Sequence, residues 1–155
     1  MKSIIDKIYN NISNIDNERD YFKFHKNRYS FILEILKKLK ISEGENLLDI
    51  GSHFLHILIG AKELNYDTYG VDLKLFVNLI EDRAKSFGII LKECDLSVSN
   101  IPFEDNFFNI ILLNETLEHL DFHPLKVFQD IYRILRPGGK VIITTPNLTR
   151  LNNRI

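Results

Sequence analysis

Five short apolar runs, each separated from the next by a segment with helical spacing, constrain the fold of this 155-residue chain most strongly. The runs are apolar at consecutive positions rather than at alternate ones, which is typical of strands covered on both faces. They span residues 46–50, 68–72, 88–92, 109–113 and 140–145. Alternation of strands with helices predicts an α/β three-layer sandwich, in which a mainly parallel sheet with right-handed crossovers carries helices on both faces.

The segments around these runs predict the helices and the domain organisation. Apolar residues recur at helical intervals in the segments 4–12, 29–39, 55–61, 76–87 and 124–135. The sequence Arg136-Pro-Gly-Gly is expected to stop the last helix and turn the chain into the fifth strand. We therefore expect a single domain overall, in which an N-terminal helical segment (1–40) packs on a core (41–155).

Composition and charge exclude several classes of protein. Hydrophobic residues make up 45% and charged residues 26% of the chain, and the net charge is −1. This balance indicates an ordinary globular protein without a specific signal for nucleic acid or an anionic membrane. The single cysteine, Cys94, favours a reducing compartment, and no apolar run has the length of a signal peptide core or a membrane span. We expect a cytoplasmic protein.

Polar and acidic residues follow the predicted strands directly, where open parallel sheets bind their ligands. Asp49 and Gly51 close the first run, Asp72 the second, Asp95 the third and Glu115 the fourth. Because the carboxyl ends of parallel strands meet at one edge of the sheet, we expect the carboxylates to line a common cleft.

These strand ends lie in motifs that resemble those of the class I S-adenosylmethionine-dependent methyltransferases. The matching segments are 47–51, 69–72, 101–110, 117–120 and 133–139. Each motif alone is weak, but five in the family's order and spacing, within residues 41–147, are specific. The resemblance implies a Rossmann-like fold and transfer of a methyl group from S-adenosyl-L-methionine by in-line displacement, which we expect to reach a small-molecule acceptor.

The resemblance also implies roles for individual residues. Asp72 would accept hydrogen bonds from the ribose hydroxyls, and Asp95 with the Leu96 amide would bind adenine. Asp49 and Gly51 would face the methionine end, and Asn114 and Glu115 the mouth where the methyl group is presented. Ser52 and Leu73 complete the predicted cofactor-binding set. Structural alternatives stay open, because Asp72, Asn114 and Glu115 could cap helices and Asp95 could form a local turn.

Candidates for the remaining chemistry are fewer. His119 is the candidate base if the acceptor must lose a proton, and the alternative is that it helps to shape the loop after the fourth strand. Arg28 and Tyr29 could close over the cofactor's carboxylate, or could be a solvated arginine and a core tyrosine. No metal site is predicted, because His119 and His123 lack the inner glutamate of a zinc-protease helix.

Two features depart from the family's pattern. The first loop reads Gly51-Ser-His-Phe-Leu55 in place of Gly-x-Gly-x-Gly, so His53 and Leu55 are expected to crowd the methionine tail or to force another loop path. The family's sheet has seven strands, and this chain ends ten residues after Thr145. We therefore expect strands six and seven to be missing from a truncated chain, with an open edge through which a homodimer could form.

Two other functions stay open. A nicotinamide-binding Rossmann domain would suit the interval of 21 residues between Gly51 and Asp72, but it needs the missing glycines to bind a pyrophosphate. A methyltransferase-like domain that no longer catalyses could serve as an interaction scaffold, which the altered loop and the open edge would both fit.

Overall fold

Five parallel strands form a single sheet in the computed structural model, which describes residues 1–12, 17–40 and 42–146. The strands are β1 (Asn46–Ile50), β2 (Asp67–Asp72), β3 (Ile90–Glu93), β4 (Phe108–Asn114) and β5 (Leu135–Thr144). Their order across the sheet is β3-β2-β1-β4-β5, and every neighbouring pair is parallel. The predicted parallel sheet is confirmed.

The order of the strands reverses between β1 and β4. From β1 the chain builds outward through β2 to β3, then returns across the sheet to β4 and continues to β5. Asp49 of β1 therefore has Gly70 of β2 on one side and Leu112 of β4 on the other. A crevice for ligands forms at such a switch point, outside the carboxyl ends of the strands.

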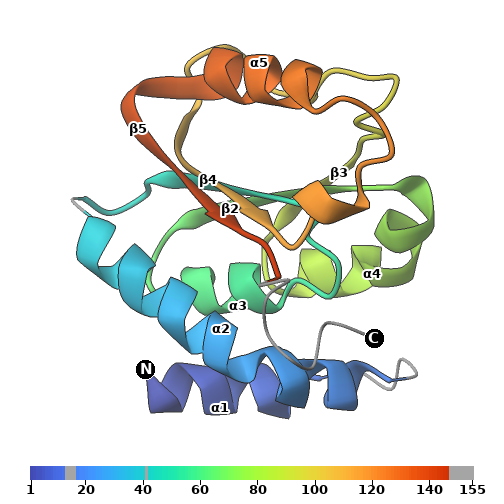
Figure 1. The fold of residues 1–155 in the computed structure, drawn as a ribbon. Helices are drawn as coiled ribbons and strands as arrows, with labels where there is room; N and C mark the ends of the chain where they lie inside the picture. Colours follow the sequence, from blue (N-terminus) through green and yellow to red (C-terminus); the bar gives the residue numbers. More distant parts are fainter. Residues whose placement is uncertain (13–16, 41, 147–155) are drawn as a thin grey trace.

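Helices cover both faces of the sheet, so the predicted three-layer sandwich is also confirmed (Figure 1). One layer holds α1 (Lys2–Asn10), α2 (Glu18–Leu39), α3 (His56–Lys62) and α4 (Lys74–Ser86), and the other holds α5 (Leu125–Ile134). A short 3₁₀ turn, η1 (Leu117–His119), follows β4. Each layer has its own core, around Ile32 and Leu58 on the α2–α3 side and around Val127 and Ile131 on the α5 side.

A buried charged cluster attaches α2 to the core. Glu18 is fully buried and accepts hydrogen bonds from Nε2 of His56, at 2.8 Å, and from the Arg83 guanidinium of α4. Arg83 also donates to the backbone carbonyl of Asn11. Since a buried carboxylate needs such partners, these contacts fix where α2 begins.

The largest differences from the sequence-based element boundaries occur in three places. The second helix begins at Glu18 rather than near residue 29, and the third strand begins at Ile90 because Gly88, with φ +62°, still belongs to the turn after α4. The fifth strand begins at Leu135, so Pro137 to Gly139 form an irregular part of β5, where the register with β4 shifts.

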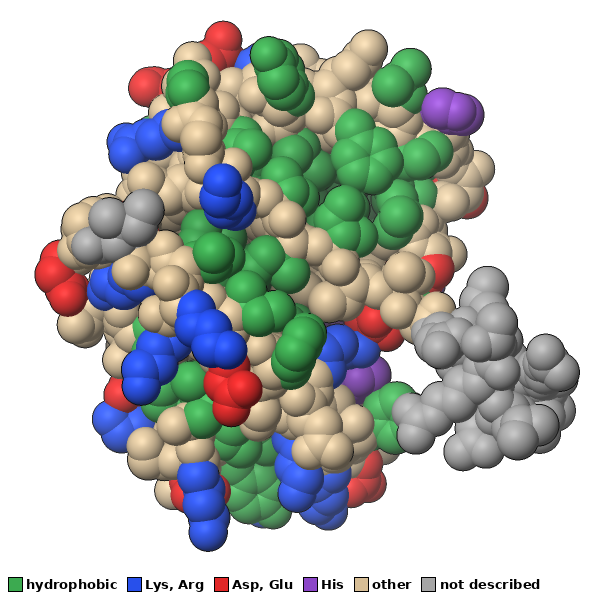
Figure 2. Space-filling model, turned by 60° about the vertical axis from the view of Figure 1, so that its left-hand side comes forward, with side chains coloured by type: hydrophobic (Ala, Val, Ile, Leu, Met, Phe, Trp, Pro, Cys, Tyr) green, Lys and Arg blue, Asp and Glu red, His purple; other side chains and the backbone are tan. Residues whose placement is uncertain are grey.

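The outer edge of β5 ends the sheet in the part of the chain that the structure describes, so no sixth or seventh strand lies within it. Val141 and Ile143 of β5 and Phe128 of α5 are partly exposed, and Tyr132 of α5 is almost fully exposed. Figure 2 shows hydrophobic side chains gathered on this side of the molecule, with Lys and Arg more frequent below them. Within residues 1–12, 17–40 and 42–146, no helix combines the length and apolar character that a membrane span requires.

Candidate functional site

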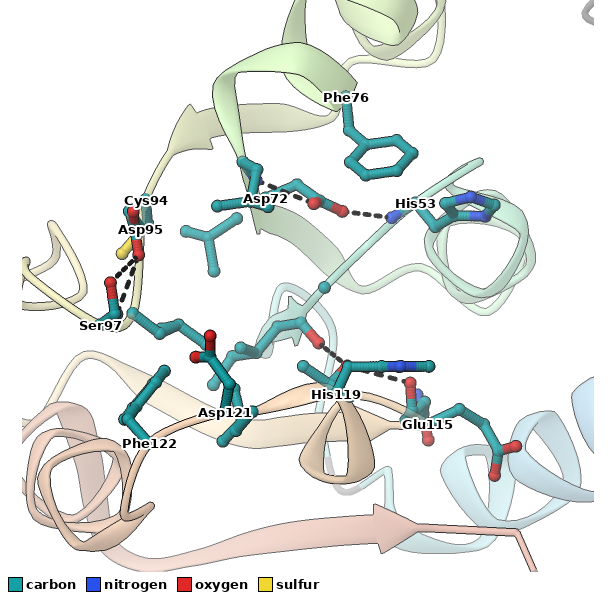
Figure 3. Close-up of a pocket in the computed structure, with 18 of the residues that line it drawn as sticks. His53, Asp72, Phe76, Cys94, Asp95, Ser97, Glu115, His119, Asp121 and Phe122 are labelled. Carbon is teal, nitrogen blue, oxygen red and sulfur yellow. Dashed lines mark hydrogen bonds between the residues drawn. The ribbon is translucent and has the colours of Figure 1, made fainter.

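A cavity of about 660 Å³ lies at the carboxyl edge of the sheet, outside the ends of β1, β2 and β4 (Figure 3). Eight of the residues predicted for the site line it: Gly51, Asp72, Leu73, Asp95, Leu96, Asn114, Glu115 and His119. The other two, Asp49 and Ser52, line a small adjoining cavity of about 30 Å³. The structure therefore brings the strand-end residues together, as the order of the motifs predicts.

Asp72 fastens the loop between β1 and α3. Its Oδ2 accepts a hydrogen bond from the backbone amide of His53 at 2.7 Å, and its Oδ1 one from the amide of Leu73 at 2.8 Å. Burial raises the pKa of this carboxyl group, and the two amide hydrogen bonds act in the opposite direction. Leu73, the N-cap of α4, makes no side-chain cap, and Asp72 instead bridges two strand ends.

The loop of residues 51–55 keeps a left-handed backbone without its expected glycines. Gly51 has φ +75°, His53 +42° and Leu55 +65°. Such a conformation costs a residue with a Cβ about 1–2 kcal/mol. Leu55 is buried in the core and does not line either cavity, so only His53 approaches the site. The crowding expected from both side chains is thus limited to one.

His53 lines the cavity from within an aromatic group. Its ring centroid lies 4.8 Å from that of Tyr21, 4.0 Å from that of Phe54 and 5.1 Å from that of Phe76. Burial lowers the pKa of His53 to about 4, with neighbouring His56 adding to the effect. At neutral pH the imidazole is therefore uncharged.

Gly51 has a steric reason to be glycine. A Cβ at this position would collide with Oγ1 of Thr116, which donates a hydrogen bond to the carbonyl of Ile50 at 3.0 Å. The amides of Gly51 and Ser52 both donate to the carbonyl of Val71. The end of β1 is thus held against the end of β2 and the segment after β4.

Asp49 is buried behind the cavity and joins three strand ends. Its Oδ1 accepts a hydrogen bond from Nδ2 of Asn114 at 3.2 Å, and Oδ1 of Asn114 accepts one from Oγ1 of Thr144 at 3.3 Å. Burial raises the pKa of Asp49 well above its ordinary value, and the Asn114 hydrogen bond opposes that shift.

The small adjoining cavity contains polar atoms without partners. Oγ of Ser52, Nε of Arg28 and Nδ1 of His53 are buried and have no hydrogen-bond partner among the described residues. Asp49 lines the same cavity. Because buried polar atoms are normally paired, this set is suited to a polar ligand group or an ordered water.

Asp95 forms the local turn that the sequence left open. Its Oδ1 accepts hydrogen bonds from the amide of Ser97 at 2.9 Å and from the Ser97 hydroxyl at 2.6 Å. The Ser97 side chain and then its amide lower the pKa of the exposed Asp95 carboxyl. The residue nevertheless lines the cavity, so the turn and a binding role are compatible.

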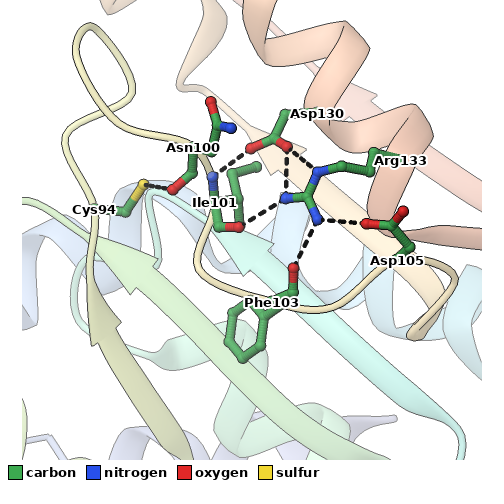
Figure 4. Close-up of polar contacts among 7 residues, drawn as sticks. All are labelled: Cys94, Asn100, Ile101, Phe103, Asp105, Asp130 and Arg133. Atoms are coloured by element: carbon green, nitrogen blue, oxygen red, sulfur yellow. Dashed lines mark hydrogen bonds and ion pairs between the residues drawn. The ribbon is translucent and has the colours of Figure 1, made fainter.

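Two of the motifs noted in the sequence, residues 101–110 and 133–139, meet beside the Asp95 turn (Figure 4). Arg133 of α5 donates to the carbonyls of Ile101 and Phe103 and pairs with Asp105 and Asp130. Asp130, which is buried, also accepts a hydrogen bond from the amide of Ile101. One guanidinium thus ties the segment after β3 to α5, and so supports one side of the cavity from below.

Glu115 and Arg28 form an ion pair beside the cavity. Nη1 of Arg28 lies 2.7 Å from Oε2 of Glu115, and both side chains are mostly buried. Glu115 has φ +49° and donates its amide to the carbonyl of Thr144. Tyr29 is a buried core residue, with its hydroxyl 3.3 Å from Nδ1 of His56.

Sequence reasoning missed several residues that line the cavity: Tyr21, Phe76, Thr116, Leu120, Asp121 and Phe122. Tyr21 belongs to α2 and precedes the first motif by 26 residues, so no local signal could have found it. Asp121 and Phe122 directly follow the motif that contains His119, and extending that motif by two positions would have included them. His119 itself is exposed and lies in η1 at the cavity wall.

The sequence profile of a methyltransferase domain matches residues 22–154. This chain belongs to the methyltransferase domain family. The methyltransferase domain is 30% identical over 113 residues to arsenite methyltransferase from Halobacterium salinarum, a match that covers 67% of this chain and 28% of the relative. The chain spans only 23% to 46% of the length of the first curated relatives.

Solved structures agree with the fold. A protein from Pyrococcus horikoshii OT3 superimposes with a TM-score of 0.69 at 20% identity, covering 96% of this methyltransferase domain and 64% of that chain. Phosphoethanolamine N-methyltransferase 2 from Haemonchus contortus was solved in complex with S-adenosyl-L-methionine and gives a TM-score of 0.63 at 30% identity. That match covers 77% of this chain and 28% of the relative. The resemblance to class I methyltransferases is therefore confirmed.

Proposed function

We propose that this domain binds S-adenosyl-L-methionine in the 660 Å³ cavity and transfers its methyl group to a small-molecule acceptor. The observation that carries the proposal is that Asp72 and Asp95, from two different strand ends, line the same cavity at the switch point of the sheet. The solved relative that holds this cofactor supports the assignment.

The residues present fit this cofactor. The cavity has the volume of a small-molecule site, for which about 300–1,000 Å³ is usual. Asp72 uses only part of its acceptor capacity on two amides, because an ionised carboxylate has about four lone-pair sites. The unpartnered atoms of Ser52 and Arg28, beside Asp49, suit a group that carries both an amine and a carboxylate.

Each strand end then holds one part of the ligand. Asp72, with Leu73 beside it, accepts hydrogen bonds from the ribose hydroxyls, and Asp95 with Leu96 binds the adenine edge. Asp49, Gly51 and Ser52 hold the amino-acid end, where Arg28 offers a cation to the carboxylate. The separation of these groups along the sheet edge sets the ligand's orientation.

Asn114, Glu115 and His119 lie where the acceptor would enter. When bound, the cofactor supplies an electrophilic methyl group on a sulfonium, which has a good leaving group. These side chains mainly align the acceptor for an in-line approach, and proximity and orientation account for most of the rate enhancement. His119 takes the proton of an acceptor that must lose one.

The proposal is tested by thermal shift with S-adenosylmethionine, S-adenosylhomocysteine and NAD at equal concentrations. We expect the first two to raise the melting temperature and NAD to leave it unchanged, since the loop of residues 51–55 lacks the glycines that a pyrophosphate needs. Absence of any shift at millimolar S-adenosylhomocysteine would contradict the proposal and would favour a non-catalytic scaffold.

Pairing of a second copy of the chain through the β5 edge also stays a prediction. Light scattering, which measures the mass of the particle in solution, tests it.

A further inference from the structure

The cavity has two walls that carry different side chains (Figure 3). The cofactor wall consists of His53, Asp72 and Phe76. The acceptor wall consists of Glu115, His119, Asp121 and Phe122, which all follow β4. If the cofactor is held as proposed above, the acceptor wall is the surface that its reaction partner touches.

Negative charge dominates the lining. Asp72, Asp95, Glu115 and Asp121 line the cavity, and among the described residues no Lys or Arg side chain does so. Arg28 lines only the small adjoining cavity and is already paired with Glu115. With the cofactor bound as proposed, Asp72 and Asp95 face the cofactor and Arg28 offsets Glu115, so Asp121 is the carboxylate left to face the acceptor.

Asp121 is the carboxylate that is free to select an acceptor. It forms no hydrogen bond or ion pair with another residue in the part of the chain that the structure describes, and Figure 3 shows its carboxylate directed into the cavity. Phe122 beside it adds an aromatic ring to the acceptor wall. Carboxylates and aromatic faces together attract cations and repel anions.

From this lining we infer that the acceptor is an amine without a phosphate or carboxylate group. This inference rests on the proposed function and names the substrate class of the same site. It separates this chain from phosphoethanolamine N-methyltransferase, the relative whose named substrate carries a phosphate. A phosphate would add about −1.5 to −2 charges to an already acidic cavity.

Methyl transfer to such an acceptor accounts for every bond, electron pair and proton. Asp121 attracts the amine in its protonated resting form. Before attack this ammonium gives one proton to His119 or to water, which frees the lone pair on nitrogen. The nitrogen then uses that lone pair to form the new N–C bond, while the C–S bond breaks and its electron pair stays on sulfur as a neutral thioether. The positive charge that passes to nitrogen is stabilised by Asp121.

The test is a pair of titrations of the ¹⁵N-labelled 155-residue chain, saturated with S-adenosylhomocysteine, followed by amide NMR. The probes are ethanolamine and phosphoethanolamine, which differ only by the phosphate. We expect ethanolamine to shift the amides of residues 116–122 with an affinity at least tenfold higher than that of phosphoethanolamine. The difference should shrink as salt is raised, because Asp121 is exposed and its charge is screened.

Matched variants assign the selectivity. Asp121→Asn should reduce the preference at least threefold, and Asp121→Lys should abolish or reverse it. Glu104→Lys changes the net charge as much as Asp121→Lys does, but at an exposed site away from the cavity, and should leave the preference intact.

Equal or tighter binding of phosphoethanolamine would overturn the inference alone. So would the absence of a shift at residues 116–122 with either probe while S-adenosylhomocysteine binds. Failure of S-adenosylhomocysteine to bind would overturn the proposed function as well.

Discussion

The two walls of the cavity are held with unequal rigidity. On the cofactor wall, both oxygens of Asp72 accept backbone amides, and the ring of His53 packs among Tyr21, Phe54 and Phe76. On the acceptor wall, Glu115 is held by its ion pair with Arg28, but His119 and Asp121 are exposed and lie on a single 3₁₀ turn and the loop after it.

This difference indicates where the domain is preorganised and where it is adaptable. A wall locked by backbone hydrogen bonds and ring packing presents the same groups to every ligand, as a cofactor site requires. Exposed loop residues such as His119 and Asp121 can change from one relative to the next without disturbing the sheet. Specificity for the acceptor is thus expected to depend on the residues after β4.

The largest expected effect is a loss of stability when a residue that supports the cofactor wall is truncated. Leu55→Ala removes a fully buried side chain directly behind the loop of residues 51–55 and should lower the free energy of unfolding by about 2–5 kcal/mol, as is usual for such a cavity. Urea denaturation measures this. His119→Ala, on the acceptor wall, should change the same quantity by less than about 0.5 kcal/mol; an equal loss in both would mean that the walls are equally rigid.

A second prediction compares ligand binding. Asp72→Ala should weaken S-adenosylhomocysteine binding about 100-fold, because hydrogen bonds to a charged group contribute about 1.5–3 kcal/mol and the loop also loses its anchor. Asp121→Ala should change that affinity less than about threefold. Isothermal titration calorimetry gives both values, with Asp67→Ala at the opposite end of β2 as a control. Similar losses for Asp72 and Asp121 would remove the distinction between the walls.

The network under the cavity offers a third comparison. Arg133→Ala leaves the buried Asp130 without its guanidinium partner and should lower the free energy of unfolding by about 2 kcal/mol in urea. The guanidinium of Arg136 makes longer contacts, at 3.2 and 3.3 Å, so Arg136→Ala should lower the free energy of unfolding by less than half as much. Equal costs would show that the guanidinium of Arg133 does not hold the segment after β3.

The smallest expected effect concerns pH. His53 has a folded pKa of about 4 against an ordinary 6.5, so the unfolded chain binds the extra proton first as pH falls. This residue's contribution is therefore fully present above pH 6.5 and is lost as pH falls from 6.5 toward 4. Relative to His53→Gln, the wild-type chain should lose about 1 kcal/mol between pH 7 and 4.5, a figure reduced for partial exposure. If the free energies of unfolding of the two proteins changed with pH in the same way, this prediction would be wrong.

Much of the fold was predictable because consecutive apolar residues report burial on both faces of a strand. The same logic placed Asp49, Asp72 and Asp95 at one edge, since parallel strands must end together. The loop of residues 51–55 was less predictable, because a sequence shows that glycines are absent but not that Leu55 can keep φ +65° while its side chain enters the core. Tyr21 was beyond prediction, since only tertiary packing brings α2 to the cavity.

The central claim is that one ligand spans three strand ends, and amide NMR with S-adenosylhomocysteine tests it most directly. We expect a single saturable titration to shift the amides of Gly51, Leu73 and Leu96 with one common dissociation constant. Shifts confined to one of these loops, or located away from the cavity, would contradict it.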